Sequence, residues 1–304
     1  MSVFMRVRNA YSYGGIKEVF RKSLFLIVYK LHNIITREIN KNTSIEYGLN
    51  RVKRDENIIV SLTSFPERFI QLGPCLKSLV IQKCKPDRII VYLGNDTKPE
   101  YITDEMHSFE KYGVEFRIDN KLNLMPHKKY IYAMQEFSNS IIVTADDDVI
   151  YPRDWLKTLY SSYKKYPKAI SARRVHLMKR NEWGLVPYDH WEDQCRRIDK
   201  PSMSLIATGN SGVLYPPHCL GNDAFDVAAI KQLCLRADDI WLKCMEVKNK
   251  IPVVWVKNWE VALPDIASSP ENMLSNENVF TGKNDRVLEN VMKYCNISFE
   301  DFFD

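Results

Sequence analysis

Short apolar runs alternate with amphipathic stretches from residue 57 onward, a pattern typical of layered α/β domains. The runs predict strands in IIVSL (58–62), KPDRIIVYLGND, VEFRID (114–119), SIIVTADDDVI (140–150), AISARRV (169–175) and GNSGVLYPP. Apolar residues three and four positions apart predict helices after TSFPERF, after Pro126 and before Tyr166, and ADDIWLKCMEV predicts a helix opened by two acids. Residues 176–204 are polar and aromatic without a clear period. The sequence therefore predicts an α/β fold.

The first 54 residues hold the excess positive charge of the chain. They contain eleven Lys and Arg against three acids, whereas the whole chain has a formal net charge of +5. The remaining residues are therefore net acidic, which argues against a nucleic-acid-binding core.

Within this N-terminal arm, apolar residues recur at helical spacing, and the basic residues lie largely off that stripe. The apolar positions are Ile16, Phe20, Leu24, Ile27, Leu31, Ile34 and Ile35. One interpretation is that residues 16–39 lie on an anionic membrane surface, where each Lys or Arg contributes about 1 kcal/mol. The other is that the same face packs on the body of the protein or on a second subunit, and the sequence leaves both open.

The composition narrows the class of protein. The 304 residues are 45% hydrophobic and 27% charged, which excludes wholesale disorder, a collagen and a multi-span membrane protein. Seven scattered cysteines without a CxxC pair predict reduced, mostly buried thiols in a cytosolic protein. The longest apolar stretch, residues 23–29, is too short to span a bilayer, so we expect neither a signal peptide nor a transmembrane helix.

The clearest candidate for chemistry is the triplet Asp146, Asp147 and Asp148, directly after the apolar strand Ile141–Ala145. The carboxyl ends of strands line the ligand crevice in open α/β sheets. Three adjacent carboxylates repel one another, so a hard divalent cation shared with phosphate oxygens is a natural partner. Alternation along an extended strand would point Asp146 and Asp148 to one side and Asp147 to the other. The alternative is a solvated acidic turn that caps the next helix together with Asp154.

The order of these motifs resembles that of bacterial family 2-type glycosyltransferases with the GT-A fold, in particular those of capsule and O-antigen gene clusters. The order is a strand with TSFPER, a strand with GND, a helix opened by PHKKY, a strand with ADDDVIYP, then GNSGVLYPP and ADDIWL. The resemblance covers roughly residues 57–260. It implies one GT-A domain at 55–260, a Rossmann-like mixed sheet flanked by helices. The basic arm at 1–54 and a C-terminal helical tail at 261–304 flank this domain.

The resemblance further implies that the acidic triplet is a DxD motif, which holds Mg²⁺ or Mn²⁺ on the diphosphate of a nucleotide-sugar. Asp148 is then the direct metal ligand, Asp146 faces the metal or the ribose, and Asp147 is a further residue that binds the nucleotide-sugar. Asp96 would accept a hydrogen bond from the nucleobase. The turn that would cradle the base and ribose contains Thr63, Ser64, Phe65, Pro66 and Arg68. Alternatively, the Phe and Pro shape the loop, and the Arg is a surface charge.

Two further expectations concern the phosphates and the metal. Lys128 would approach a phosphate as a point charge, whereas its neighbour His127 is expected to be structural. Many GT-A enzymes supply an additional metal ligand, often a histidine, near the end of the domain. No histidine follows His218 here, so Asp265 is a candidate substitute, and diphosphate and water are the alternative.

Asp238 and Asp239 match the second acidic pair of the family. Inverting transfer needs one general base for the acceptor hydroxyl, a role that the resemblance gives to Asp239, with Asp238 as its orienting or acceptor-binding partner. Helix capping is the alternative. Gly209 and Gly212 would admit the transferred sugar or mark a strand bend. Stacking on acceptor sugars or core packing is expected of Trp183, Tyr188, His190 and Trp191.

These observations favour an inverting, metal-dependent, hexosyltransferase-like enzyme. It would move a sugar from a uridine-linked donor to a lipid-linked cell-surface glycan, as a peripheral protein at the inner face of the cell membrane. One rival is a sugar-nucleotide nucleotidyltransferase, which the lack of a Gly-rich GxG(T/S) loop after the first strand disfavours. The other is a non-catalytic carbohydrate-binding protein that retains the fold, against which the two intact acidic motifs argue.

Overall fold

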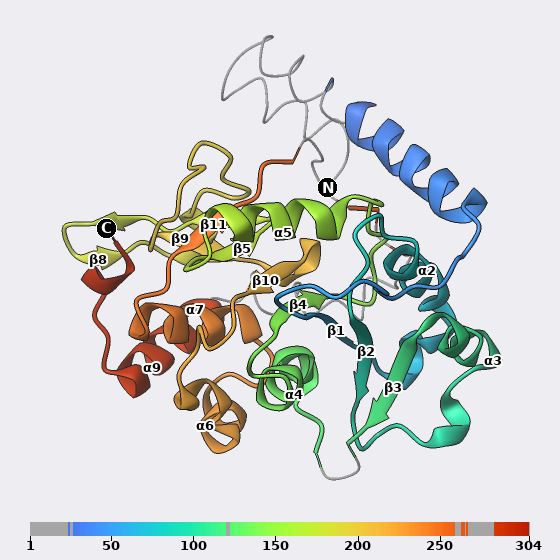
Figure 1. Ribbon diagram of the computed structural model, residues 1–304. Coiled ribbons are helices and arrows are strands. Elements are labelled where there is room, and N and C mark those ends of the chain that lie inside the picture. Colours follow the sequence, from blue (N-terminus) through green and yellow to red (C-terminus); the bar gives the residue numbers. More distant parts are fainter. Residues whose placement is uncertain are drawn as a thin grey trace, which may run out of the picture.

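The computed structural model describes residues 24, 27–119, 122–258, 263–264, 266 and 283–303 (Figure 1). A seven-stranded sheet forms its centre, in the order β11-β5-β10-β4-β1-β2-β3. Strand β10 runs antiparallel between β4 and β5, and the other pairings are parallel. The strands are β1 (Ile58–Thr63), β2 (Arg88–Leu93), β3 (Val114–Ile118), β4 (Ile141–Ala145), β5 (Ile170–Ala172), β10 (Val213–Tyr215) and β11 (Val253–Trp255). This mixed sheet confirms the predicted α/β fold.

Helices cover both faces of the sheet. Along β1, Ile59 packs into one core while Val60 and Leu62 pack into the other, because successive side chains of a strand point to opposite faces. The first core includes side chains of α4 (Lys128–Glu136), α6 (Val227–Leu233), α7 (Asp238–Lys248) and α9 (Lys283–Cys295). The second includes those of α2 (Gly73–Val80), α3 (Asp104–His107) and α5 (Trp155–Lys165). Figure 1 shows α6, α7 and α9 gathered together, away from α2 and α3.

The predicted strand at 140–150 is wrong in its second half. Strand β4 ends at Ala145, where its pairing with β1 also ends, and Asp147 and Asp148 lie in a turn. Without a ladder of backbone hydrogen bonds to keep the chain extended, the expected alternation of the three carboxylates does not hold. Instead, Nη1 of Arg68 contacts both Asp147 and Asp148.

The segment without a clear period contains short antiparallel pairs. Strand β6 (Val175–Leu177) pairs with β9 (Leu205–Ala207), and β7 (Arg180–Asn181) pairs with β8 (Gly184–Leu185) in a small hairpin. These strands are only two or three residues long, too short for a pattern of alternation to identify them.

The described part of the C-terminal tail belongs to the domain core. Helix α9 packs against α7, and its Leu288 and Val291 are buried in the same core as Ile59. Phe302, beyond the helix, is fully buried there as well. The tail therefore completes the hydrophobic layer that supports α7.

Residues 27–42 form a helix whose apolar stripe faces solvent. Exposed fractions of 40–57% are found for Leu24, Ile27, Val28, Leu31, Ile34, Ile35 and Ile39. The predicted amphipathic helix is confirmed over these positions, whereas Ile16 and Phe20 lie outside the described residues. The alternative that the stripe packs on the protein's own body is wrong at these positions.

The other side of this helix buries polar groups. His32, Thr36 and Asn40 follow one another at intervals of four residues and are each 5–6% exposed. Asn40 donates a hydrogen bond to the carbonyl of Pro74 at 3.0 Å, and Lys77 donates one to the carbonyl of Lys41 at 2.7 Å. These bonds tie the C-terminal end of the helix to α2 through its polar side and leave the apolar stripe facing outward.

Two further expectations can be compared with the structure. Within the described ranges, no helix is both long and apolar enough to cross a bilayer. All seven cysteines are unpaired and six of them are buried, which confirms the predicted free thiols.

Candidate active site

Lys129 joins the two acidic motifs. Its Nζ lies 2.8 Å from Oδ1 of Asp146, directly after β4, and 2.9 Å from Oδ2 of Asp238, in the first turn of α7. Burial alone would lower the pKa of Lys129, but Asp146, Asp238 and Asp239 raise it well above its ordinary value. A buried ammonium ion therefore holds together two carboxylates that are far apart in the sequence.

The motif resemblance implies a role for Lys128 but none for Lys129. Helix α4 begins at Lys128 and places Lys129 one turn before Ala133, on the apolar face of the helix. The Oγ of Ser61 in β1 donates a hydrogen bond to the carbonyl of Lys129, which fixes this turn against the sheet. A lysine on the apolar face of a predicted helix indicates a buried, paired charge. That signal could have identified the residue.

Asp239 lies beside this ion pair and differs from Asp238 in its protonation. Its Oδ1 accepts a hydrogen bond from the backbone N–H of Gly209 at 3.1 Å. Burial and the neighbouring charge of Asp238 raise the pKa of Asp239 to about 8. Burial alone would raise the pKa of Asp238, but Lys129 holds it below its usual range. Asp238 is thus the ionised partner of Lys129, and Asp239 is the carboxyl that exchanges a proton near neutral pH.

Arg68 anchors the other side of the acidic triplet. Its Nη1 lies 2.6 Å from Oδ1 of Asp147 and 3.1 Å from Oδ2 of Asp148. Ser64 donates a hydrogen bond to Oδ2 of Asp147 at 2.6 Å. Burial opposes the charge of Arg68, but Asp147 and Asp148 more than offset it and raise the pKa of the guanidinium. The alternative that Arg68 is a surface charge is therefore wrong, since its side chain is mostly buried and paired.

Asp96 and Lys128 meet through Asn123. The Nδ2 of Asn123 donates to Oδ2 of Asp96 at 2.8 Å, and Lys128 donates to Oδ1 of Asn123 at 2.6 Å. Burial lowers the pKa of Lys128 more than the carboxylates of Asp96 and Asp147 raise it. A Cβ atom at Gly94 would lie 2.8 Å from side-chain atoms of Asn123 and Asp96, so a larger residue there would displace these side chains. The group forms one wall beside the triplet.

The remaining residues of the predicted nucleotide turn make contacts that hold the turn in place. Thr63 donates a hydrogen bond to the carbonyl of Tyr92 at 2.7 Å. The guanidinium of Arg68 lies 5.0 Å from the ring centre of Phe65, and Pro66 opens a short 3₁₀ helix that carries the arginine. His127 is fully buried, and its ring nitrogens lie 3.0 Å from the carbonyl of Cys234 and the hydroxyl of Tyr130. It has the structural position that the sequence analysis expected.

The triplet offers two carboxylates to a metal ion. The side chains of Asp146 and Asp148 are 27% and 23% exposed, whereas that of Asp147 is 6% exposed and held by Ser64 and Arg68. In the part of the chain that the structure describes, no three His, Cys, Asp or Glu side chains converge as a complete ligand set. Asp265 lies outside that part. The residues fit a cation that completes its shell with phosphate and water oxygens, as Mg²⁺ commonly does.

Residues 68–218, which include the acidic triplet and the Gly209 turn, match the family model of Glycosyl transferase family 2. The chain contains a family 2 glycosyltransferase domain. The prediction that it is a glycosyltransferase is thereby confirmed. The family match supports a nucleotide-sugar as its donor.

Solved structures agree with this assignment at the level of the fold. The glycosyltransferase is similar to "Mannosyltransferase PcManGT from Pyrobaculum calidifontis in complex with GDP-Man and Mn2+", at 11% identity and a TM-score of 0.50. The match covers 93% of this chain and 76% of that one, and supports the GT-A fold. No curated protein matches the chain in sequence.

Two further solved structures are similar at lower TM-scores. One is S. aureus TarS 1-349 in complex with UDP, at 15% identity and a TM-score of 0.43, covering 80% of this chain and 72% of that one. The other is CMP:2-keto-3-deoxy-manno-octonic acid synthetase complexed with CTP, at 9% identity and a TM-score of 0.44, covering 72% of this chain and 95% of that one.

The two glycines of the glycosyltransferase's GNSG turn make room for protein side chains. A Cβ atom at Gly209 would lie 2.8 Å from Nζ of Lys129. Gly212 has φ of +93°, and a Cβ atom there would lie 2.5 Å from the ring of Trp155. Trp155 in turn donates to the carbonyl of Ser211 at 2.8 Å, which fixes the turn that supports Asp239.

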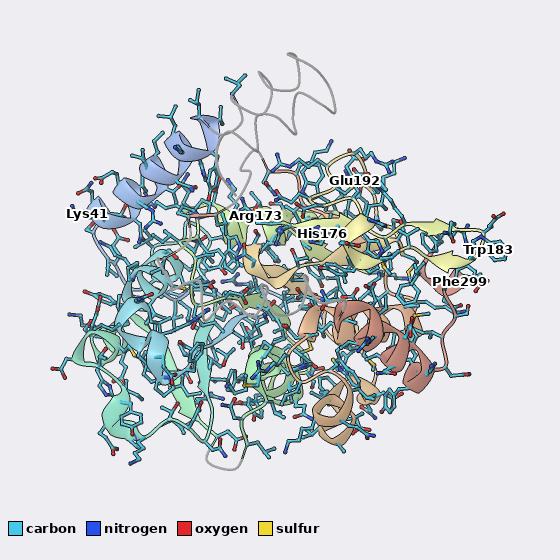
Figure 2. The ribbon with its side chains drawn as sticks, turned by 180° about the vertical axis from the view of Figure 1, so that it is seen from behind. Lys41, Arg173, His176, Trp183, Glu192 and Phe299 are labelled. Atoms are coloured by element: carbon cyan, nitrogen blue, oxygen red, sulfur yellow. The ribbon has the colours of Figure 1, made fainter. Side chains whose placement is uncertain are left out.

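The aromatic residues expected near the acceptor have different surroundings. Trp191 is buried and lies 4.7 Å from Tyr188, ring centre to ring centre, as in the core-packing alternative. Trp183 is 85% exposed at the β7–β8 hairpin, and Figure 2 shows it at the outer edge of the molecule beside Phe299. For Tyr188, burial raises the pKa, and the charge of Asp239 raises it further.

Proposed function

We propose that this glycosyltransferase transfers a sugar with inversion from a nucleotide-sugar donor, a UDP-sugar, with a divalent metal ion and with Asp239 as the general base. The observation that carries the proposal is the contact of Lys129 with both Asp146 and Asp238. This contact brings the DxD motif and the second acidic pair into one site, where a donor and an acceptor hydroxyl can meet.

Asp239 has the properties that the transfer requires of its base. In an inverting displacement, the acceptor oxygen bonds to the anomeric carbon, the nucleoside diphosphate leaves with its bonding electrons, and the acceptor hydroxyl loses one proton. Burial and Asp238 place the pKa of Asp239 near the pH at which a base works best. The proton passes to the Asp239 carboxylate, while Asp238 stays paired with Lys129.

The donor side of the proposal rests on the triplet and its neighbours. Asp146 and Asp148 would hold a metal ion, which would supply positive charge to stabilise the leaving diphosphate. Arg68 contacts Asp148 and so fixes its carboxylate. Lys128 and Asp96, linked through Asn123, form the wall that we assign to the nucleotide.

Thermal stabilisation by nucleotides tests this assignment. A ligand at 100 times its dissociation constant adds about 2.7 kcal/mol to the stability of the native state. We expect UDP to raise the melting temperature of the wild type only when Mn²⁺ is present, and to have no such effect on Asp148→Ala. Asp239→Asn should keep the shift but lose turnover of the donor.

Asp154→Asn is the matched control, because Asp154 follows the triplet closely and its side chain makes no capping hydrogen bond at α5. This variant should behave as the wild type. If no nucleotide shifts the melt of the wild type, the donor site is wrongly assigned. Release of pyrophosphate from UTP and a sugar phosphate would instead support the nucleotidyltransferase alternative.

The acceptor that we propose is a lipid-linked cell-surface glycan, reached at an anionic membrane. The support is the helix at 27–42, whose outward apolar stripe is flanked by the exposed basic residues Lys30, Arg37 and Lys41. A continuous exposed apolar stripe marks an interaction surface, and flanking positive charge fits anionic lipid.

Liposome flotation tests the membrane proposal. The triple variant Ile27→Ser, Leu31→Ser, Ile35→Ser should release the protein from anionic vesicles, whereas Val52→Ser with Ile70→Ser should not. The control removes two side chains that are 74% and 78% exposed but lie outside the stripe. Unchanged flotation of the triple variant would contradict the proposal, and loss of a dimer in solution would assign the stripe to a second copy.

A further inference from the structure

Helix α5 and the residues beside it carry a basic ridge on their outer side. The segment 153–168 contains five Lys and Arg and one acid, whereas the rest of the chain after residue 54 is net acidic. All five basic residues are exposed, namely Arg153, Lys157, Lys164, Lys165 and Lys168. The inner side of α5 packs into the second core through Trp155, Leu156, Leu159 and Tyr163. The helix therefore presents charge of one sign to solvent.

The lysines of this basic ridge lie beside tyrosine rings rather than carboxylates. Among the residues that the structure describes, no carboxylate forms an ion pair with Lys157, Lys164 or Lys168. Nζ of Lys164 lies 4.9 Å from the ring centre of Tyr160, which is half-buried. Tyrosine, with an apolar ring and a polar end, is enriched where a protein meets the boundary of a lipid bilayer. Lysines without acidic partners next to such rings fit a negatively charged lipid surface.

Hydrogen bonds join α5 to the helix at 27–42 by way of α2. Gln82, just beyond α2, donates to the carbonyl of Pro152 at 2.8 Å and accepts from the N–H of Leu156 at 3.1 Å. The two bonds described above tie the helix at 27–42 to α2. Since α2 and α5 both pack into the second core, they cover the same face of the sheet. Figure 1 shows α5 and the helix at 27–42 along the upper side of the molecule.

We propose that the basic ridge of α5 is a second membrane contact of this enzyme and binds the headgroups of anionic lipids, while the apolar stripe at 27–42 enters the interface. The inference rests on the proposed membrane association and adds the surface of the folded domain that faces the lipid. The nearby stripe favours a lipid surface over a soluble polyanion, because a soluble polyanion would leave the apolar side chains in water. Two contacts on one rigid unit would fix the orientation of the domain on the membrane.

Vesicle flotation of the full chain tests the proposal. The vesicles are phosphatidylcholine alone, or phosphatidylcholine mixed with phosphatidylserine, and the wild type should bind the mixed vesicles more tightly. The triple variant Lys157→Gln, Lys164→Gln, Lys168→Gln should lower the partition coefficient on mixed vesicles by about 100-fold, or roughly fivefold for each lysine. Its melting temperature should match that of the wild type, because the three lysines are exposed.

A second triple variant removes the same charge elsewhere on the surface. It is Lys111→Gln, Lys231→Gln, Lys293→Gln, in which all three lysines are exposed and lie outside the basic ridge. Lys111 also matches Lys164 in its surroundings, since its Nζ lies 5.0 Å from the ring centre of Tyr112. This control should bind the mixed vesicles nearly as tightly as the wild type, because charges farther than a Debye length from the membrane are screened.

The outcomes separate this inference from the membrane proposal on which it rests. If the variant of the apolar stripe is released from mixed vesicles but the Lys157, Lys164 and Lys168 variant binds as the wild type does, the membrane association stands and α5 is not a contact. Equal losses in the two lysine variants would also overturn the inference, since net charge alone would then explain them. Loss of heparin binding with unchanged vesicle binding would assign the basic ridge to a soluble polyanion instead. A wild type that does not float would contradict the membrane proposal itself.

Discussion

Nζ of Lys129 and Oδ2 of Asp238 form a buried ion pair 2.9 Å apart, with side chains 6% and 12% exposed. Because neither group has free access to water, each charge depends on the other for compensation. Asp146 contacts the same ammonium from the end of β4, so one lysine stabilises carboxylates from two motifs. The site is therefore sensitive to the loss of this one positive charge.

Replacement of Lys129 by methionine should impair both stability and activity. The variant leaves Asp238 buried without its partner and removes a contact of the half-buried Asp146, so we expect the free energy of unfolding to fall by about 3 kcal/mol. We also expect donor turnover to fall by about 100-fold, because the charge that orients the second acidic pair is gone. Urea denaturation and a turnover assay measure the two effects.

Lys231→Met is the control for this variant, since Lys231 is exposed on α6 and contacts neither motif. It should change the free energy of unfolding by no more than about 0.5 kcal/mol and leave donor turnover unchanged. A Lys129→Met protein with wild-type stability would show that the ion pair contributes no net stabilisation.

Activity should depend on pH through Asp239. A general base acts only when deprotonated, and the pKa of Asp239 is raised to about 8. We therefore expect kcat/KM to rise with pH and to level off above about pH 8, rather than near the ordinary aspartate value. The pH–rate profile of the wild type measures this, and Asp239→Asn should lose the rising limb along with most of its activity. A profile that is flat between pH 5 and 8 would exclude Asp239 as the base.

The apolar patterns predicted the sheet because β1, β2 and β4 are buried on both faces, and they located the acidic triplet at the end of β4. They failed just beyond Ala145, where the end of the β1 ladder releases Asp147 and Asp148 into a turn. No periodicity reports where a ladder of hydrogen bonds stops, because that depends on the partner strand.

The pairing of charges was equally inaccessible to pattern analysis. Arg68 lies in the short 3₁₀ helix after β1 and Asp147 in the turn after β4, and only the fold brings them to 2.6 Å. Both adjacent lysines are buried, and the helical phase places Lys129 on the apolar face, but the motif resemblance drew attention to Lys128. The structure places the acidic pair at the start of α7, as predicted, but the opposite pKa shifts of Asp238 and Asp239 depend on burial and on the contact of Asp238 with Lys129, which the sequence does not contain.

Alanine substitution at two glycines should separate backbone strain from steric overlap. Gly184 has φ of +138° and its Cβ atom would meet no atom closer than 3.9 Å, so Gly184→Ala should cost about 1 kcal/mol of stability. Gly212 has φ of +93° and its Cβ atom would lie 2.5 Å from the Trp155 ring, which should bring the cost to about 3 kcal/mol. Urea unfolding of both variants measures the difference, and equal costs would show that Trp155 moves aside freely.

Stability should fall as pH rises through the titration of Glu246. This side chain is 1% exposed in α7, with Nζ of the fully buried Lys243 3.6 Å away, and burial raises its pKa to about 7. Between pH 4.5 and 7 the folded state therefore binds a proton that the unfolded state has released, so the free energy of unfolding decreases with increasing pH. Glu246→Gln removes this contribution and leaves all other groups in place. The stability of the wild type relative to the variant, from urea unfolding at pH 5, 6, 7 and 8, should drop by an amount on the order of 3 kcal/mol over this range. A relative stability that stays constant or increases with pH would mean that Lys243 keeps Glu246 ionised in the folded protein.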